Sequence, residues 1–359
     1  MERRWGSPDA ATAAVRLAVR TALADLAADP SAPTDAGPTA PTDADPTAPT
    51  GPTGAGRPGL VLVACSGGAD SLALAAALAF EAPTARWRAG AVVVDHGLQP
   101  GSAQVAADAG RQLRALGLDP VDVVTVEVVG AGEGLEAAAR SARYAALADA
   151  ADRHRAGVVL LGHTRDDQAE QVLLGLTRGA GARSLSGMPP ARGRFRRPLL
   201  AVSREQCRES TRAQGLAWWD DPMNEDPAFT RVRARRALAD LERDLGPGVT
   251  AALARTASLL RVDADHLDAL ADAAVAALGP QPWPVEALTG IPRAVRTRVW
   301  RRLLVAAGAP AGQVGRPHTD ACDRLLTAWH GQGPVHAPGH LRVARSGRRV
   351  TIAPRDRVD

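Results

Sequence analysis

One stretch, residues 60–72, constrains the fold more than any other part of the chain. Its first six residues are apolar and partly β-branched, which indicates a buried parallel strand. Ser-Gly-Gly follows, and an Ala/Leu-rich helical pattern begins near Ser71. A strand, a glycine turn and a helix start in this order are typical of an anion site, because the first helical amides have no partners within the helix.

The residue types in the turn favour a phosphate as that anion. Gly67 and Gly68 let the backbone approach a phosphate without a Cβ in the way. Ser66 and Ser71 add hydroxyl donors, and Asp70 can hold the Mg²⁺ that accompanies a polyphosphate. The plainer alternative is a turn of small residues capped by Asp or Ser. A serine at both ends and an aspartate in the fifth place favour phosphate binding.

The composition excludes several chemistries. The sequence contains no lysine, so this turn is not the common P-loop, and lysine nucleophiles or Schiff bases are also excluded. Three scattered cysteines, at 65, 207 and 322, offer neither a disulfide framework nor a C-x-x-C pair. A net charge of +4 is mildly basic and compatible with a nucleic-acid partner. With no signal peptide or long apolar span, we expect a cytoplasmic protein without a membrane partner.

Strands alternate with helices from residue 60 onward. This alternation predicts an α/β fold with a doubly wound, mostly parallel sheet, in which ligands bind at the carboxyl ends of the strands. The expected strands are 60–65, 90–95, 121–129 and 157–162, and the expected helices are 72–80, 102–116, 136–153 and 166–176.

Acidic side chains follow two of these strands. Asp95 comes after the second strand, and it is either a turn or cap residue or a residue that faces the phosphate edge. Asp167 and Glu170 follow the fourth strand, three residues apart on one helix face. They either complement the helix dipole or bind Mg²⁺ or a cationic substrate. His163 and Asp167 suggest a transition-metal pair only weakly, since no third ligand is apparent.

The chain is predicted to have five parts. Residues 1–28 contain an N-terminal helix, and 29–58 form a Pro/Thr/Ala-rich linker whose composition cannot bury a core. Residues 59–236 form the phosphate-binding catalytic domain. Residues 237–278 form a helical connection, which is interrupted at Gly-Pro-Gly (246–248). Residues 279–359 form a smaller, mainly helical domain that ends in a β-hairpin with the two-residue turn 346–347.

Eight segments of the chain resemble the motifs of one protein family and follow the same order as in that family. They resemble the bacterial tRNA(Ile)-lysidine synthases of the PP-loop ATP pyrophosphatase superfamily, with looser similarity beyond residue 290. The segments are Ser66-Gly67-Gly68-Ala69-Asp70-Ser71, Val94-Asp95-His96-Gly97-Leu98, Arg140 with Arg143-Tyr144, Gly162 through Glu170, Arg178 through Gly181, Gly187-Met188, Arg197-Pro198-Leu199-Leu200 and Asp221 through Asp226.

The resemblance implies a reaction and its participants. Family members split ATP between its α and β phosphates and adenylate the C2 oxygen of the wobble cytidine in a CAU anticodon. The amine of free lysine then attacks C2 to give lysidine, which changes codon specificity from AUG to AUA. The implied co-substrate is ATP, the cofactor is Mg²⁺, and the partners are L-lysine and tRNA(Ile). Assembly as a homodimer is left open.

The resemblance also implies residue roles. Asp70, Asp167 and Glu170 would be catalytic, with Asp70 and Asp167 as metal ligands. Residues 66–71, with Asp95 and His163, would bind ATP. An anticodon loop also needs phosphate contacts, and arginines cluster at 192–197, 231–236 and 293–302. These clusters are either a solvated surface or tRNA-binding, and the expected tRNA-binding residues are Arg197, Arg231, Arg233, Arg235, Arg301 and Arg302. The chain departs from the family at Val232, where an asparagine is usual.

Two other functions compete with lysidine formation. Another PP-loop enzyme, such as a tRNA thiolase or a synthetase of the GMP or argininosuccinate type, would share the ATP site. Cytidine thiolases generally use paired cysteines that this chain lacks, and the Asp-Asp-Gln-Ala-Glu segment favours a lysidine synthase. A non-enzymatic nucleotide-binding or RNA-binding protein would be expected to lose acids such as Asp70 or Asp167.

Overall fold

The computed structural model describes residues 8–28, 59–128, 135–179 and 181–355. Its contacts divide the chain into two compact units, residues 1–258 and 259–359. The division falls within the connection predicted for residues 237–278. The predicted linker, 29–58, lies outside the described residues. No helix in the described ranges combines the length and the apolar character needed to cross a membrane.

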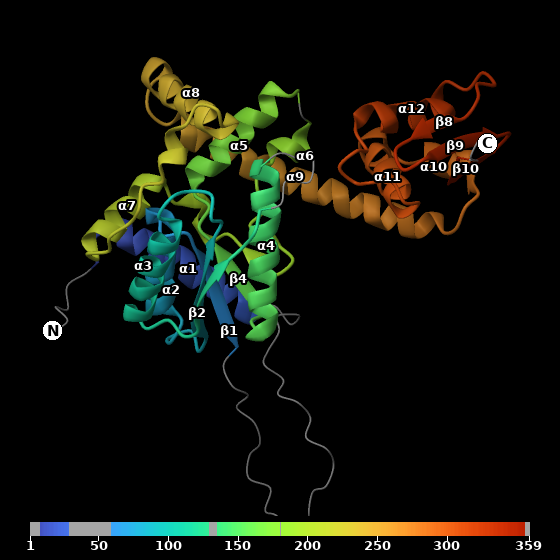
Figure 1. Ribbon diagram of the computed structural model, residues 1–359. Coiled ribbons are helices and arrows are strands. Elements are labelled where there is room, and N and C mark those ends of the chain that lie inside the picture. The colour runs from blue at the N-terminus through green and yellow to red at the C-terminus, as the bar shows by residue number, and fades with distance from the viewer. Residues whose placement is uncertain (1–7, 29–58, 129–134, 180, 356–359) are drawn as a thin grey trace, which may run out of the picture. The chain divides into compact units, whose positions relative to one another are not determined.

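A six-stranded sheet forms the centre of the first unit (Figure 1). Its order is β3-β2-β1-β4-β6-β5, and every pairing is parallel except that of β5 with β6. This confirms the predicted doubly wound, mostly parallel sheet. The strands are β1 Leu60–Cys65, β2 Arg88–Asp95, β3 Val121–Thr125, β4 Val158–Leu161, β5 Ala191–Arg192 and β6 Phe195–Arg196.

The helices of the first unit pack around this sheet. The N-terminal helix α1 lies against α2 and α7 and contributes Val15, Val19 and Leu23 to the main core. The predicted break at residues 246–248 separates α8 from α9, which continues past the boundary of the unit. The helices are α1 Ala10–Ala28, α2 Ala69–Glu81, α3 Ser102–Ala115, α4 Leu135–Arg153, α5 Arg165–Thr177, α6 Ala182–Leu185, η1 Pro198–Ala201, α7 Arg204–Ala213, η2 Pro222–Glu225, α8 Thr230–Leu245 and α9 Val249–Leu278.

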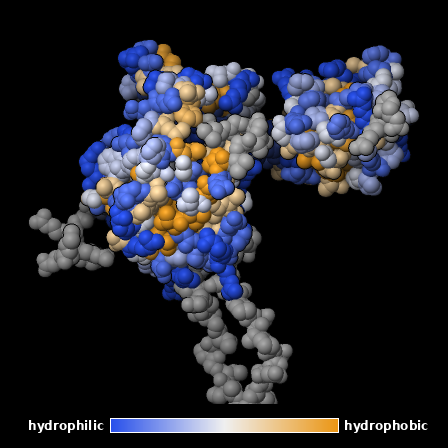
Figure 2. All heavy atoms as spheres, viewed as in Figure 1, coloured by the Kyte–Doolittle hydropathy of each residue, from blue (hydrophilic) through white to orange (hydrophobic). Residues whose placement is uncertain are grey.

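The edge strand β3 is shorter than predicted. It ends at Thr125 rather than residue 129, because Thr125 pairs with Asp95, the last residue of its one neighbour, β2. Val123 on this strand is 41% exposed. In Figure 2 an apolar area is visible on the first unit, where Figure 1 shows the sheet between α3 and α4.

The order of the strands reverses between β1 and β4. The chain moves from β1 outward to β2 and β3, and then returns to place β4 on the other side of β1. Such a switch point leaves a crevice at the carboxyl ends of the two central strands. Gly162, directly after β4, lets this end approach the start of α2, because a Cβ there would lie 3.2 Å from Cα of Ser71.

The second unit combines helices with a four-stranded antiparallel sheet of order β7-β10-β9-β8. The predicted hairpin is present as β9 and β10, but its two-residue turn is 347–348, since Ser346 pairs with Arg349. Trp300 and Leu304 lie fully buried in the core of this unit. Its elements are β7 Trp283–Pro284, α10 Val285–Thr289, α11 Arg293–Ala306, α12 Arg316–Thr327, β8 Val335–Ala337, β9 Leu341–Ser346 and β10 Arg349–Pro354.

The close approach at Gly162 predicts a stability effect. In Gly162→Ala, the new Cβ meets backbone atoms of Ser71 and Asp70 at 3.2–3.4 Å, so the end of β4 must move. We expect a loss of about 1–3 kcal/mol in the free energy of unfolding, as for other overpacked sites. Urea denaturation measures it. Gly312→Ala, where a Cβ meets open space, is the matched control, and equal effects of the two substitutions would refute this packing argument.

Candidate active site

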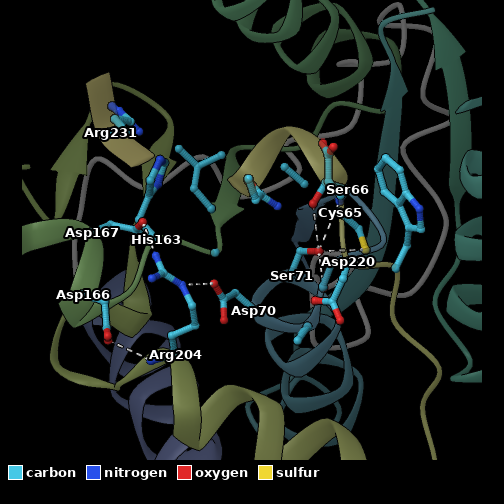
Figure 3. A pocket seen from close by; sticks show the side chains of 18 of the residues that line it. Cys65, Ser66, Asp70, Ser71, His163, Asp166, Asp167, Arg204, Asp220 and Arg231 are labelled. Carbon is cyan, nitrogen blue, oxygen red and sulfur yellow. Dashed lines mark hydrogen bonds and ion pairs between the residues drawn. The ribbon is translucent and has the colours of Figure 1, made fainter. Parts of the chain in front are cut away.

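A pocket of about 960 Å³ lies at the carboxyl ends of β1 and β4 (Figure 3). It is formed by the loop after β1, the β4–α5 turn, the start of α7, the segment 219–225 and the start of α8. All of these belong to the first unit. Its lining includes Ser66, Gly68, Asp70, Ser71, Arg143, His163, Asp166, Asp167, Arg204, Arg231, Val232 and Arg235.

The loop after β1 has the geometry expected of a phosphate site. Gly67 has φ +81°, a conformation that favours glycine, and its carbonyl accepts a hydrogen bond from the Trp219 amide at 3.0 Å. The hydroxyl of Ser71 donates to the Gly68 carbonyl at 2.9 Å and accepts from the Ser66 amide at 3.2 Å, so it shapes the loop. No side chain caps the start of α2, and Ser66 is exposed beside it.

Asp70, in the first turn of α2, has an unusual environment. Its Oδ1 is buried and has no hydrogen-bond partner among the described residues, and its Oδ2 lies 3.6 Å from Nε of Arg204. Burial raises the pKa of Asp70 to about 6; Arg204 opposes this shift, while Asp167 and Asp166 add to it. A carboxylate oxygen in the first turn of α2 that has no partner among the described residues fits a ligand of Mg²⁺.

Asp167 caps its own helix and also faces the pocket. Its Oδ2 accepts hydrogen bonds from the amide of Thr164 at 2.7 Å and from the hydroxyl of Thr164 at 3.0 Å. Its Oδ1 accepts from Nη2 of Arg204 at 2.9 Å. Burial by itself would raise the pKa of Asp167, but Arg204 and the Thr164 amide outweigh it and lower that pKa. Asp167 is therefore ionised at neutral pH.

Glu170, one turn later on α5, is 3% exposed and already ion-paired. Its Oε1 accepts from Nε of Arg235 at 2.9 Å and from Nη2 of Arg204 at 3.3 Å. The structure thus brings Asp70, Asp167 and Glu170 together around one guanidinium, and Figure 3 shows Arg204 between Asp70 and Asp167.

Arg204 was not among the residues nominated from the sequence. The local signal there is Ser203 with Gln206, a capping box that marks the start of α7 but reveals no distant partner. The backbone amide of Arg204 donates to Oδ2 of Asp166 at 2.9 Å, and the amide of Arg165 donates to the Val202 carbonyl at 2.8 Å. These contacts join the starts of α5 and α7.

Of the other residues nominated for ATP, His163 reaches the pocket and Asp95 does not line it. The Nδ1 of His163 is buried and finds no partner in the part of the chain that the structure describes. Burial lowers its pKa to about 4, with Asp167 opposing and nearby arginines adding to the shift, so the imidazole is neutral at pH 7. Asp95 is 6% exposed and its Oδ1 accepts from the Gly97 amide at 2.9 Å, which is the turn role considered as the alternative.

The six nominated arginines have different surroundings. Arg231 and Arg235 line the pocket, beside Val232, which is 5% exposed and offers only an apolar surface. Arg197 is 6% exposed and donates to the Pro189 carbonyl at 2.8 Å, which leaves it little surface for an RNA in this conformation. Arg233 donates to the Pro227 carbonyl at 2.7 Å.

In the second unit, the two nominated arginines also bind within the protein. Arg301 donates to the carbonyls of Ala311 and Val314. Arg302 bonds to the carboxylates of Asp268 and Asp272. These contacts use part of each guanidinium's donor capacity.

Arg143 is a further basic residue of the pocket. Burial lowers the pKa of its guanidinium; Tyr144 opposes this, while Arg140 and Arg231 add to it. Within the described part of the chain it has no carboxylate partner. A half-buried guanidinium in this position can bind an anion. The sequence placed Arg143 in a family-like segment but did not indicate that it lines the pocket.

Comparisons with known proteins agree with this geometry. The family model of the PP-loop domain matches residues 54–242. A tRNA(Ile)-lysidine synthase from Thermobifida fusca is 58% identical over 293 residues, which cover 81% of this chain and 89% of the relative. The chain belongs to the tRNA(Ile)-lysidine synthase family. A second relative of the same name, from Streptomyces coelicolor, is 56% identical over 82% of this chain and 85% of its own length.

Among solved structures, a U34-tRNA thiolase from Methanococcus maripaludis is similar over 56% of this chain and 72% of that chain, at 17% identity and a TM-score of 0.48. That likeness is too low to carry an argument. The relatives named tRNA(Ile)-lysidine synthase also distinguish the chain from the other PP-loop enzymes considered above. The members of this family are ligases.

The raised pKa of Asp70 predicts a pH-dependent gain in stability for Asp70→Asn. A carboxyl whose pKa is higher in the folded state stabilises the fold below its unfolded pKa, and this contribution is lost as pH rises through about 6. Without ATP or Mg²⁺, the stability advantage of the variant over the wild type should therefore grow by about 2 kcal/mol between pH 4.5 and pH 8.

Urea unfolding at the two pH values measures this advantage. Asp240→Asn, which removes an exposed carboxylate on α8, is the control. An advantage of Asp70→Asn that stays constant or shrinks toward pH 8 would contradict the account of the Asp70 environment.

Proposed function

We propose that the protein uses ATP to ligate free lysine to C2 of the wobble cytidine in tRNA(Ile) with a CAU anticodon. The product is lysidine, and the reaction passes through an adenylated tRNA. The observation that carries the proposal is one pocket lined both by the loop after β1 and by Asp166 and Asp167 of α5, in a chain 58% identical to a relative named tRNA(Ile)-lysidine synthase.

The phosphates of ATP would bind at the start of α2. The uncapped first amides of this helix and the exposed hydroxyl of Ser66 supply donors. Asp70 would hold Mg²⁺ through Oδ1, which has no partner among the described residues. Asp167 would be the second metal ligand. Mg²⁺, when bound, neutralises charge on the departing diphosphate.

The chemistry requires two substitutions. The C2 oxygen of the cytidine first attacks the α-phosphorus of ATP, and diphosphate leaves. The amine of lysine then attacks C2, and the former C2 oxygen departs as part of AMP. Lysine must lose a proton to become a nucleophile, so a carboxylate or a phosphate oxygen has to accept it.

Glu170 supports the proposed binding of lysine. Both of its ion pairs with the described residues use Oε1, so Oε2 can accept a hydrogen bond from an ammonium group. Its burial excludes water from this contact, which strengthens a charge-assisted bond. Arg231 and Arg235, which line the pocket, would contact the tRNA.

The cysteines argue against thiolation of a cytidine. All three are free and buried, and they are far apart in the sequence. Burial raises the pKa of the Cys65 thiol, which keeps it protonated at neutral pH. A thiol in this state is a poor nucleophile and a poor metal ligand.

Incubation of the full chain with ATP, isotope-labelled lysine and tRNA(Ile) tests the proposal. Nucleoside mass spectrometry should find lysidine that carries the label, and none when ATP is omitted or when uridine replaces the wobble cytidine. Turnover of ATP without labelled lysidine would exclude the proposed activity.

Substitutions on α5 should separate the two half-reactions. If Glu170 holds the ammonium of lysine, Glu170→Gln should raise the lysine KM about ten- to a hundred-fold, as expected for a charge-assisted bond. Diphosphate release should change much less. Asp167→Asn should damage both steps, because Asp167 would also serve Mg²⁺.

Diphosphate release and lysidine formation are measured separately for each variant. Glu209→Gln, an exposed acid on α7, is the matched control. Equal damage to both steps in Glu170→Gln would instead assign that carboxylate to the metal and ATP.

A further inference from the structure

One guanidinium connects the two halves of the proposed site. Nε of Arg204 lies 3.6 Å from Oδ2 of Asp70, on α2, and its Nη2 lies 2.9 Å from Asp167 and 3.3 Å from Glu170, on α5. We propose that Arg204 is a positioning residue for both half-reactions, which fixes the ATP-side and lysine-side carboxylates relative to each other. The division into an ATP side and a lysine side rests on the proposed function.

The charges make this cation necessary. Asp70 and Asp167 are half-buried and Glu170 is buried, and like charges that converge away from bulk water repel each other strongly. Burial by itself would lower the pKa of Arg204, but these carboxylates raise it, so the guanidinium remains charged. Its planar fork of donors can contact several carboxylates at once, which a single ammonium does less well.

The backbone of Arg204 is held by α5, one of the two helices that its side chain connects. Its amide is held by Asp166 on α5, and the adjacent Ser203 closes the capping box of α7. The side chain is 18% exposed and extends from this anchor to Asp70 on α2. A displacement of Arg204 would therefore disturb α5 and the start of α2 together.

Arg235 cannot replace Arg204 in this role. Arg235 also binds Oε1 of Glu170, at 2.9 Å, but its other hydrogen bond goes to the Asn224 carbonyl. It makes no ion pair with Asp70 or Asp167 among the described residues. Arg204 alone therefore connects the two groups of acids in this part of the chain.

The test measures two separate constants for three variants of the full chain. One constant is the Kd of a fluorescent, non-hydrolysable ATP analogue with Mg²⁺, in the absence of tRNA and lysine. The other is the lysine KM, measured with kcat for lysidine formation. The variants are Arg204→Gln, Arg204→Lys and the control Arg212→Gln, which removes an exposed arginine of the same helix that packs near the Trp218 ring.

We expect Arg204→Gln to raise both the analogue Kd and the lysine KM by about ten-fold or more, the scale of one charge-assisted bond. Arg204→Lys keeps the charge and should recover part of both losses. Arg212→Gln should leave both constants within about two-fold of wild type.

A shift in only one constant, or equal effects of Arg204→Gln and Arg212→Gln, would overturn the proposal. If Arg204→Gln does not fold, Arg204→Lys decides: it must raise both constants, to a smaller extent. A wild-type protein that binds the analogue but forms no lysidine would count against the proposed function instead. The analogue Kd would then still test the contact between Arg204 and Asp70.

Discussion

The site depends on one arrangement of charges, the Arg204 guanidinium among three carboxylates, of which Glu170 is buried and Asp70 and Asp167 are half-buried. Carboxylates on α2 and α5 could not stay ionised and close together in this region without a cation between them. The guanidinium supplies that cation, while hydrogen bonds from the Arg204 and Arg165 backbones join α7 to α5. The acidic site is therefore formed before any substrate binds, and its charge is partly balanced.

The fold places this cluster where an α/β sheet binds its ligands. The reversal of strand order between β1 and β4 opens the crevice. Gly67 permits the turn after β1, and Gly162 lets the end of β4 approach the start of α2. Asp70 lies at the start of α2, after β1, and Asp167 lies at the start of α5, after β4. A nucleotide at the start of α2 would thus lie next to the acids of α5, as an adenylation followed by an amine transfer requires.

The sequence predicted the main sheet and its helices well, because apolar periodicity and glycine turns are local signals. It predicted neither the two-residue strands β5 and β6 nor the short strands β7 and β8. Strands of two or three residues are too short to show an alternating apolar pattern. The turn of the hairpin was placed one residue too early, because Ser346 belongs to the ladder.

The sequence predicted those residues of the candidate site that residue type and motif spacing identify without knowledge of the fold. Asp70, His163, Asp167 and Glu170 were found in this way, and all lie close to the pocket or line it. Arg204 was missed because its partners Asp167 and Glu170 are 37 and 34 residues away in sequence. Inward-facing arginines pose the same difficulty: Arg197 stands in an arginine-rich stretch that is typical of an RNA surface, yet it binds a backbone carbonyl.

The central claim is that one pocket first transfers AMP to the tRNA and then exchanges it for lysine. The most direct measurement uses ATP labelled at the α-phosphate, with tRNA(Ile) and no lysine. Our account predicts that the label moves to the tRNA at its wobble cytidine, and that it is released as AMP when lysine is added. Label that never enters the tRNA, with lysidine formed all the same, would contradict the account.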